Sequence, residues 1–156
     1  EDLPKMKRPC HSHSAAVLAT DIYLAGGYDS ASFDAFDTVS LRWKTEENQE
    51  NIPITIESAA LVALKGRYLA VIGGWNSQIG CLRSCFIYDC VFSCWSEMPK
   101  SLYMNAALRH HTAAVLDGKV FVFGGIGCSI QDHSSFIEYI NVDDLLDCTP
   151  LIYPLP

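Results

Sequence analysis

Apolar and β-branched residues occur along this chain in short runs that are bounded by turn signals. The runs at residues 15–19, 58–64 and 112–116 are each followed by a tight polar or glycine-containing turn and then by a second apolar run. Short runs of this kind are typical of β-strands rather than of helices. The pattern therefore predicts an all-β fold that begins each unit with an antiparallel hairpin. The hairpin turns are expected at Thr20-Asp21, Lys65-Gly66 and Asp117-Gly118.

The second run of each hairpin ends at a pair of glycines. These pairs are Gly26-Gly27, Gly73-Gly74 and Gly124-Gly125, and they are separated by 47 and 51 residues. Glycine allows a buried strand to end where φ is positive or where another backbone approaches too closely for a Cβ atom. An internal repeat of about 50 residues with a four-strand pattern is typical of β-propeller arrays.

An aromatic residue, an aspartate and a tryptophan follow the glycines in the first two units, with the same spacing among themselves. Phe36-Asp37 is followed by Trp43, and Tyr88-Asp89 is followed by Trp95; in both units the tryptophan is the seventh residue after the aromatic residue. Large, partly apolar rings suit the seam between two packed sheets. We therefore interpret these residues as structural.

The third unit is the weakest copy. Tyr139 lies fourteen residues after Gly125, as Tyr88 lies fourteen residues after Gly74, so Tyr139 is taken as the third aromatic residue. Leu146 stands where the third tryptophan is expected.

The order of apolar run, Gly-Gly, aromatic-Asp and Trp resembles the kelch repeat. The resemblance covers nearly the whole chain and divides it into repeats at residues 1–51, 52–97 and 98–156, of which the third is degenerate. In kelch propellers each repeat forms one four-stranded antiparallel blade. The resemblance therefore implies an all-β, kelch-type β-propeller segment of three such blades in an incomplete ring.

Three blades are fewer than the four to eight that typically close a propeller, so open faces and unpaired strand edges are expected at the ends. Three arrangements would cover these faces and edges. The chain could be half of a six-bladed ring, two copies could pair into one ring, or another domain could cap the arc. Leu3-Pro4 and Leu155-Pro156 resemble Ile52-Pro53 and Met98-Pro99, which open the second and third units. This similarity favours a piece of a longer kelch chain.

Composition bears on partners and location. The 156 residues carry eleven Lys and Arg against eighteen Asp and Glu, a net charge of -7 without a basic stripe, so no nucleic acid partner is expected. No apolar run approaches the length of a membrane span, so no membrane partner is expected either. Seven irregularly spaced cysteines favour reduced thiols inside a cell, and we expect a cytoplasmic protein.

No catalytic or metal-binding pattern stands out. Cys81, Cys85, Cys90 and Cys94 lack the paired CxxC spacing of zinc sites. The sequence contains no GxSxG, HExxH or phosphate-binding glycine loop. The histidines at positions 11, 13, 110 and 111 are interpreted as structural or surface residues. We therefore expect no cofactor, no metal and no enzyme activity.

The candidate site is a rim of loops on one face of the propeller. Because strands alternate in direction, the loop between the second and third strands of each blade emerges beside the connection that leads into the first strand. Trp75 lies in such a loop, among polar residues, a composition typical of interface hot spots; packing on the blade edge is the alternative role for its ring. The proposed partner-binding residues are Ser12, Tyr28, Trp75, Asn76, Gln78, Arg109 and His110.

The kelch resemblance implies a protein-protein interaction module. Kelch domains of ubiquitin-ligase adaptors hold short peptides with residues at these rim positions, often with an arginine just before the first strand. The closest parallel is the substrate-binding domain of a cullin-type ubiquitin ligase adaptor, with a BTB domain ahead of the propeller. An actin- or scaffold-binding kelch protein and a galactose-oxidase-like copper enzyme are the alternatives. Besides the protein partner at the rim, self-pairing of the open blade edges is expected.

Overall fold

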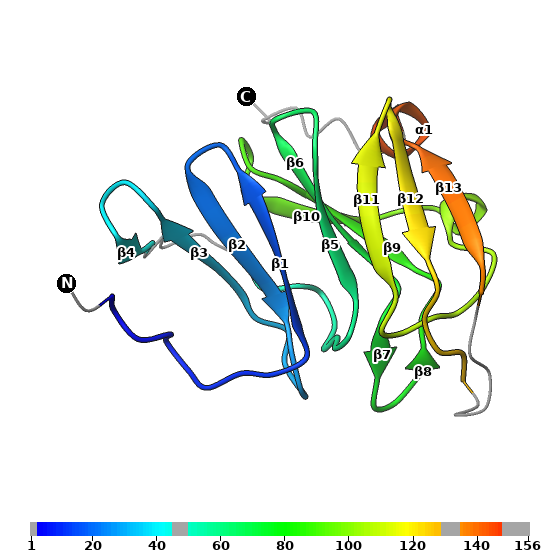
Figure 1. Cartoon of the computed structure of the whole chain (residues 1–156), viewed down its shortest axis with the longest axis horizontal. Coiled ribbons are helices and arrows are strands. Elements are labelled where there is room, and N and C mark those ends of the chain that lie inside the picture. The colour runs from blue at the N-terminus through cyan, green and yellow to red at the C-terminus, as the bar shows by residue number, and fades with distance from the viewer. Residues whose placement is uncertain (1–2, 45–49, 129–134, 148–156) are drawn as a thin grey trace, which may run out of the picture.

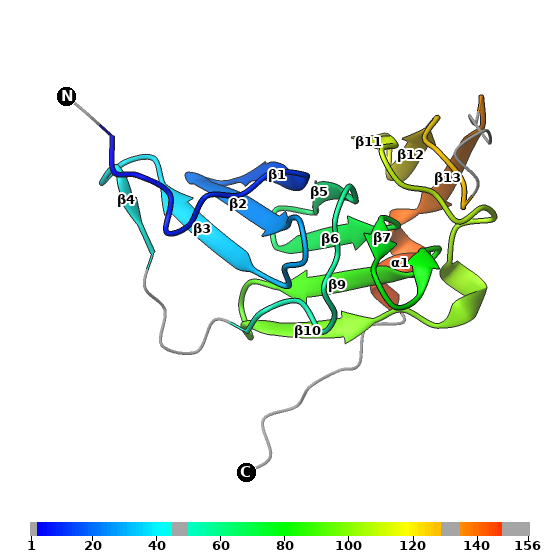
Figure 2. The same cartoon turned by 90° about the horizontal axis from the view of Figure 1, so that it is seen from below.

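Three antiparallel sheets fan out from a shared inner edge formed by the first strand of each sheet (Figures 1 and 2). The computed structural model describes residues 3–44, 50–128 and 135–147. The first sheet has the order β1-β2-β3-β4, the second β10-β9-β6-β5 and the third β11-β12-β13, while β7 and β8 form a small hairpin of their own. The elements are β1 (His13–Leu18), β2 (Asp21–Gly26), β3 (Phe33–Asp37), β4 (Arg42–Trp43), β5 (Ala60–Leu64), β6 (Tyr68–Ile72), β7 (Trp75–Asn76), β8 (Gly80–Cys81), β9 (Cys85–Asp89), β10 (Cys94–Glu97), the short 3₁₀ helix η1 (Lys100–Leu102), β11 (Thr112–Leu116), β12 (Lys119–Phe123), β13 (Ile137–Asn141) and α1 (Val142–Asp147).

The all-β prediction is confirmed, and the hairpin turns show how local chemistry produces it. Asp117 and Gly118 both have positive φ, 49° and 71°, and join Leu116 to its partner Lys119 in a two-residue loop. This is the turn that an Asp-Gly pair favours between antiparallel strands. The first hairpin differs by one residue from the prediction, because Leu18 pairs with Asp21 and the turn is therefore Ala19-Thr20.

The paired glycines lie where neighbouring sheets come closest. Gly26 and Gly27 have φ values of 68° and 120°, and a Cβ atom on Gly26 would overlap the carbonyl oxygen of Ile56, in the segment leading into the second sheet. The amide of Gly27 donates to that same oxygen over 2.9 Å. In the second unit, the amide of Gly74 donates to the carbonyl of Leu108 over 2.8 Å. The backbone contacts between sheets are therefore possible because these residues have no side chain.

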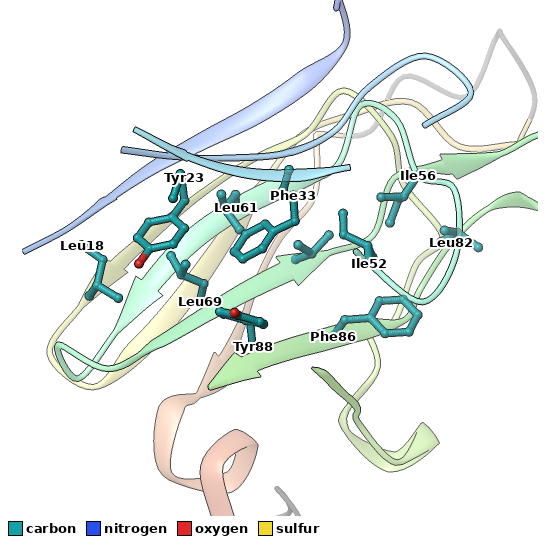
Figure 3. Packing of buried hydrophobic residues seen from close by; sticks show 13 residues of the cluster. Leu18, Tyr23, Phe33, Ile52, Ile56, Leu61, Leu69, Leu82, Phe86 and Tyr88 are labelled. Carbon is teal, nitrogen blue, oxygen red and sulfur yellow. The ribbon is translucent and has the colours of Figure 1, made fainter. Parts of the chain in front are cut away.

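Apolar side chains fill both seams between the sheets. Figure 3 shows the first seam, where Tyr23 and Phe33 from the first sheet face Leu61, Leu69 and Tyr88 from the second. The second seam packs residues of β6 and β9 against residues of β12 and β13. No helix in the described residues is long and apolar enough to span a membrane.

The aromatic residues that follow the glycines in the second unit lie in the first seam. Tyr88 is only 2% exposed, and its ring centroid is 4.6 Å from that of Phe33. The ring centroid of Trp95 is 4.9 Å from the Phe33 centroid, and its indole Nε1 donates to the carbonyl oxygen of Glu50 over 3.0 Å. These rings therefore join the second blade to the first.

The third unit departs from the prediction in its alignment. Ile140 pairs with Val120 as Tyr88 pairs with Leu69, so Ile140, and not Tyr139, is the counterpart of Tyr88. The segment from Gly125 to Ile140 is one residue longer than the segment from Gly74 to Tyr88 in the second unit. Successive residues of a strand point to opposite faces. Tyr139 consequently lies on the other face, where it is 56% exposed.

The described residues contain three of the four strands predicted for the third blade. The third sheet has three strands there. Leu146, at the position where the fourth strand was expected to begin, lies in α1. Any strand after residue 147 would fall outside the described residues.

One face of the third sheet is apolar and open. Phe123, Ile137 and Tyr139 on this face are 38%, 65% and 56% exposed. The pairings place Ile72 and Cys85 at the positions of Phe123 and Ile137 in the second sheet, and both are fully buried there by the third sheet. The face therefore has the composition and position of a seam, without a sheet on its far side in the described residues.

Candidate binding site at the loop rim

The rim loops lie together at one end of the sheets. The loop from β2 to β3, the β7–β8 hairpin and the segment that follows β12 all extend toward the lower edge of Figure 1, and Figure 2 views the molecule from that side. The β3–β4 turn and the β11–β12 turn lie at the other ends of their strands.

A repeated backbone contact builds this rim. The amide of Tyr28 donates to the carbonyl of His11 over 3.0 Å, and Trp75 and Glu57 exchange two backbone hydrogen bonds of 2.8 and 2.9 Å. In the third unit, Ile126 pairs with Arg109 in the same way. The structure thus places His11, Glu57 and Arg109 at equivalent positions in successive units.

A second set of hydrogen bonds links the units to one another. Ser12, Ser58 and His110 have φ values of 59°, 53° and 57°, a left-handed conformation that non-glycine residues adopt uncommonly. The amide of Ser58 donates to the carbonyl of Ser12 over 2.8 Å, and the amide of His110 donates to that of Ser58 over 2.9 Å. Ser12 and His110 therefore contribute to the rim through their backbone.

A pocket of about 250 Å³ opens on the rim between the first and second sheets. Tyr28 forms one wall: it is 64% exposed, and its ring stacks on His11 with a centroid distance of 5.1 Å. A second hollow, of about 270 Å³, shares Tyr28 and Asp29 with this pocket and is also lined by Arg8 and His11. The first pocket is lined by Tyr28, Asp29, Thr55, Ile56, Glu57, Trp75, Asn76 and Ser77.

Asn76 shapes the floor of the pocket. Its Nδ2 donates to the carbonyl oxygen and to Oγ1 of Thr55 over 2.8 and 2.9 Å. Its Oδ1 accepts from the amides of Gln78 and Ile79 over 2.9 and 3.0 Å. The residue as a whole is 6% exposed, and the polar atoms of its side chain form hydrogen bonds within the protein. Asn76 therefore holds the loop in shape.

The structure brings together some of the predicted rim residues and separates others. Tyr28, Trp75 and Asn76 line the same pocket. Gln78 is exposed at the tip of the β7–β8 hairpin, outside the lining. Arg109 is half-buried next to the second seam, and its Nε atom has no hydrogen-bond partner among the described residues.

Five pocket residues lie outside the predicted partner-binding set, namely Asp29, Thr55, Ile56, Glu57 and Ser77. Glu57 could have been found, because it directly precedes Ser58 as Arg109 directly precedes His110. Its carboxylate oxygen Oε2 is buried and has no hydrogen-bond partner among the described residues.

The thiols near the second seam are held in their protonated form. Burial raises the pKa of the Cys81 thiol, and the neighbouring Cys128 thiol raises it further. Cys85, which is completely buried, has a pKa raised by burial to about 12. Within the described part of the chain, no group of three or more His, Cys, Asp or Glu residues is arranged to hold a metal ion.

The architecture defines an arc of a β-propeller, with blades joined by glycine-mediated backbone contacts and aromatic seams. Residues 4–125 match the family model described as the KLHDC2/KLHL20/DRC7 Kelch-repeats domain. The chain therefore belongs to the kelch-repeat family, and the predicted resemblance is confirmed.

Individual relatives agree with this assignment. The chain is 32% identical over 143 residues to Kelch-like protein 33 of Homo sapiens, covering 88% of this chain and 26% of that protein. It is 25% identical over 136 residues to Kelch domain-containing protein 3 of Bos taurus, covering 78% of this chain and 35% of that protein. Beta-scruin of Limulus polyphemus is 31% identical over 147 residues, which cover 86% of this chain and 15% of beta-scruin. The chain thus spans about a third or less of each of these relatives.

Proposed function

We propose that this chain is a protein-interaction module that binds a peptide segment of its partner at the rim pocket. The observation that carries the proposal is the pocket between Tyr28 and Trp75, which combines two aromatic walls with polar groups. Tyrosine and tryptophan are enriched among the residues that dominate interface energies. The pocket is smaller than the roughly 300–1,000 Å³ typical of small-molecule sites. Its size suits one side chain of a larger partner.

We further propose that the parent protein is cytoplasmic and works as a substrate receptor of a cullin-type ubiquitin ligase. Support comes from the kelch repeats and from their resemblance to the kelch domains of BTB adaptors. Purification of the full-length protein from cells tests this assignment. Recovery of a cullin supports the receptor role, whereas recovery of actin without a cullin favours the scaffold-binding alternative.

A second contact is proposed at the open end of the arc. Phe123, Ile137 and Tyr139 present an apolar sheet face whose counterpart in the second blade is buried. We propose that a second copy of the chain covers this face when the chain is isolated, because blade faces of this kind already pack against each other at both seams.

Substitutions at the rim test the interaction directly. Trp75→Ala and Arg109→Ala should each weaken binding of the physiological partner to the full-length protein, Trp75→Ala by about tenfold or more, as expected for a hot-spot tryptophan. Tyr28→Ala removes the opposite wall and, because Tyr28 is 64% exposed, disturbs the core less than Trp75→Ala.

Val39→Ala is the matched control, because Val39 is 75% exposed in the β3–β4 turn at the opposite end of the sheet. Thermal unfolding curves identify any variant that has lost the fold. If the folded Trp75, Arg109 and Tyr28 variants all bind the partner as tightly as the unmodified chain, the rim is not the binding surface.

A further inference from the structure

The rim pocket is acidic. Two carboxylates, Asp29 and Glu57, line it, and its described lining includes no Lys, Arg or His. The ion pairs of the described residues lie elsewhere, and none of them involves Asp29 or Glu57. Within its lining, the pocket therefore carries negative charge without a described cationic side chain; Arg8 and His11 line the adjoining hollow, which shares Asp29.

Glu57 is the group in most need of a partner. Its Oε2 atom is buried without a hydrogen bond in the described residues. Leaving a buried carboxylate oxygen without a partner is costly, because the group has lost its contacts with water and gained nothing in exchange. A cation brought into the pocket would stabilise this carboxylate.

The walls of the pocket also suit a cation. The faces of tyrosine and tryptophan rings attract ammonium and guanidinium groups, and Tyr28 and Trp75 line the pocket together with Glu57. The hydrocarbon stem of a lysine or arginine side chain can pack on such rings while its charged end reaches a carboxylate.

The position of Glu57 carries an acidic side chain in only one of the three units. The positions equivalent to Glu57 carry His11 in the first unit and Arg109 in the third. Because the carbonyl at this position accepts a hydrogen bond from the residue after the Gly-Gly pair in all three units, the difference in charge is a property of the side chains. The pocket at the first seam is thus electrostatically distinct from the rest of the rim.

We propose that the rim pocket binds a lysine or arginine side chain of the partner peptide, with Glu57 as its principal counter-charge and Tyr28 and Trp75 as its walls. The inference rests on the proposed function and adds the chemical class of the anchoring residue. It differs from the expectation of an arginine contributed by the rim itself, because here the basic residue comes from the partner.

A defined peptide library provides the probe. N-acetylated, C-amidated peptides of random sequence, with one central position fixed in turn as Arg, Lys, Ala or Glu, are bound to the 156-residue chain, and the dissociation constants of the retained peptides are measured by fluorescence anisotropy. Capping both ends removes the terminal charges, so that a preference for Arg or Lys reports on the side chain.

The expected result is a preference for Arg or Lys at the fixed position, reduced about tenfold in the variant Glu57→Gln, which corresponds to about 1.4 kcal/mol. Glu57→Gln keeps the shape of the side chain and removes its charge. Asp117→Asn is the matched control: it also removes one negative charge, lies in the β11–β12 turn, and keeps a residue that this turn type accepts. It should leave the preference unchanged.

The inference is overturned if basic residues are not preferred, or if their preference survives in Glu57→Gln. Peptides that bind through acidic or apolar residues and require Trp75 would leave the proposed function standing while refuting the basic anchor. If no peptide binds and Trp75→Ala also leaves the physiological partner bound, both proposals are wrong.

Discussion

The glycine pairs offer a stringent test of how the blades are held together. Adding one methyl group at Gly26 should destabilise the fold far more than adding it at Gly66. The two residues have nearly the same backbone conformation, with φ values of 68° and 65°. A Cβ atom on Gly26 would overlap the carbonyl oxygen of Ile56, whereas a Cβ atom on Gly66 has no heavy atom within 4 Å. The comparison therefore isolates the contact between sheets.

The magnitudes follow from these surroundings. Placing an L-residue in the left-handed region costs about 1–2 kcal/mol, and this cost applies to both variants. Gly26→Ala must in addition move the segment around Ile56 away from the first sheet. That movement breaks the 2.9 Å hydrogen bond from the Gly27 amide, and leaving a buried donor without a partner costs about 1–3 kcal/mol. Forcing extra volume into a packed seam adds about 1–3 kcal/mol.

Gly26→Ala should therefore lower the free energy of unfolding by roughly 3–8 kcal/mol and Gly66→Ala by about 1–2 kcal/mol. Urea unfolding followed by tryptophan fluorescence measures both values, and Trp95 lies in the affected seam. Gly118→Ala is a second control, since its φ is 71° and nothing lies within 4 Å. Equal losses at Gly26 and at the two control positions would refute the claim that the glycines are required by backbone contact between sheets.

The remaining predictions concern the second seam and the open face. Burial lowers the pKa of His111, whose Nε2 lies 3.0 Å from the Ile72 carbonyl oxygen. The unfolded chain therefore binds a proton on His111 more readily than the folded chain, so the free energy of unfolding should fall as the pH drops below about 6.5. The urea unfolding midpoint should depend less on pH in His111→Asn than in His110→Gln, the control at the exposed neighbouring residue. Identical pH profiles of the two variants would contradict this prediction. The isolated chain should self-associate, as measured by sedimentation velocity. Phe123→Lys should weaken the affinity of self-association at least tenfold, whereas Val39→Lys should leave it unchanged. Equal effects of the two substitutions would place the contact elsewhere.

The strands and turns could be predicted because they depend on local chemistry. The Asp117-Gly118 turn follows from two residues that accept positive φ, and the Gly-Gly pairs mark strand ends wherever they occur. The face that a side chain occupies depends on register, and a shift by one residue reverses it. Matching Tyr139 to Tyr88 by their equal spacing from the glycine pairs missed one extra residue in the third unit, and the pairing of Ile140 with Val120 corrects the match.

The site was only partly predictable for a different reason. Tyr28 and Trp75 stand out in sequence as aromatic residues directly after a Gly-Gly pair. The pocket, however, is formed where the first unit meets the second, and Glu57 joins it through pairing with Trp75. Repeat matching compares equivalent positions in different units, whereas the pocket also brings Tyr28 of the first unit beside Glu57 of the second, and these two positions are not equivalent.

Scaffold and specificity are carried by different parts of the same residues. Ser58 and Ser12, and Glu57 and Trp75, are joined through backbone atoms, and these bonds recur in the neighbouring unit although the side chains differ. Since backbone hydrogen bonds do not depend on side-chain identity, the position before each first strand can vary without loss of the blade. That freedom explains why His11, Glu57 and Arg109 can occupy one structural position with three different chemistries. If the rim binds a partner as proposed, its ligand preference resides in these side chains, on a frame that the glycines and the seams hold in place.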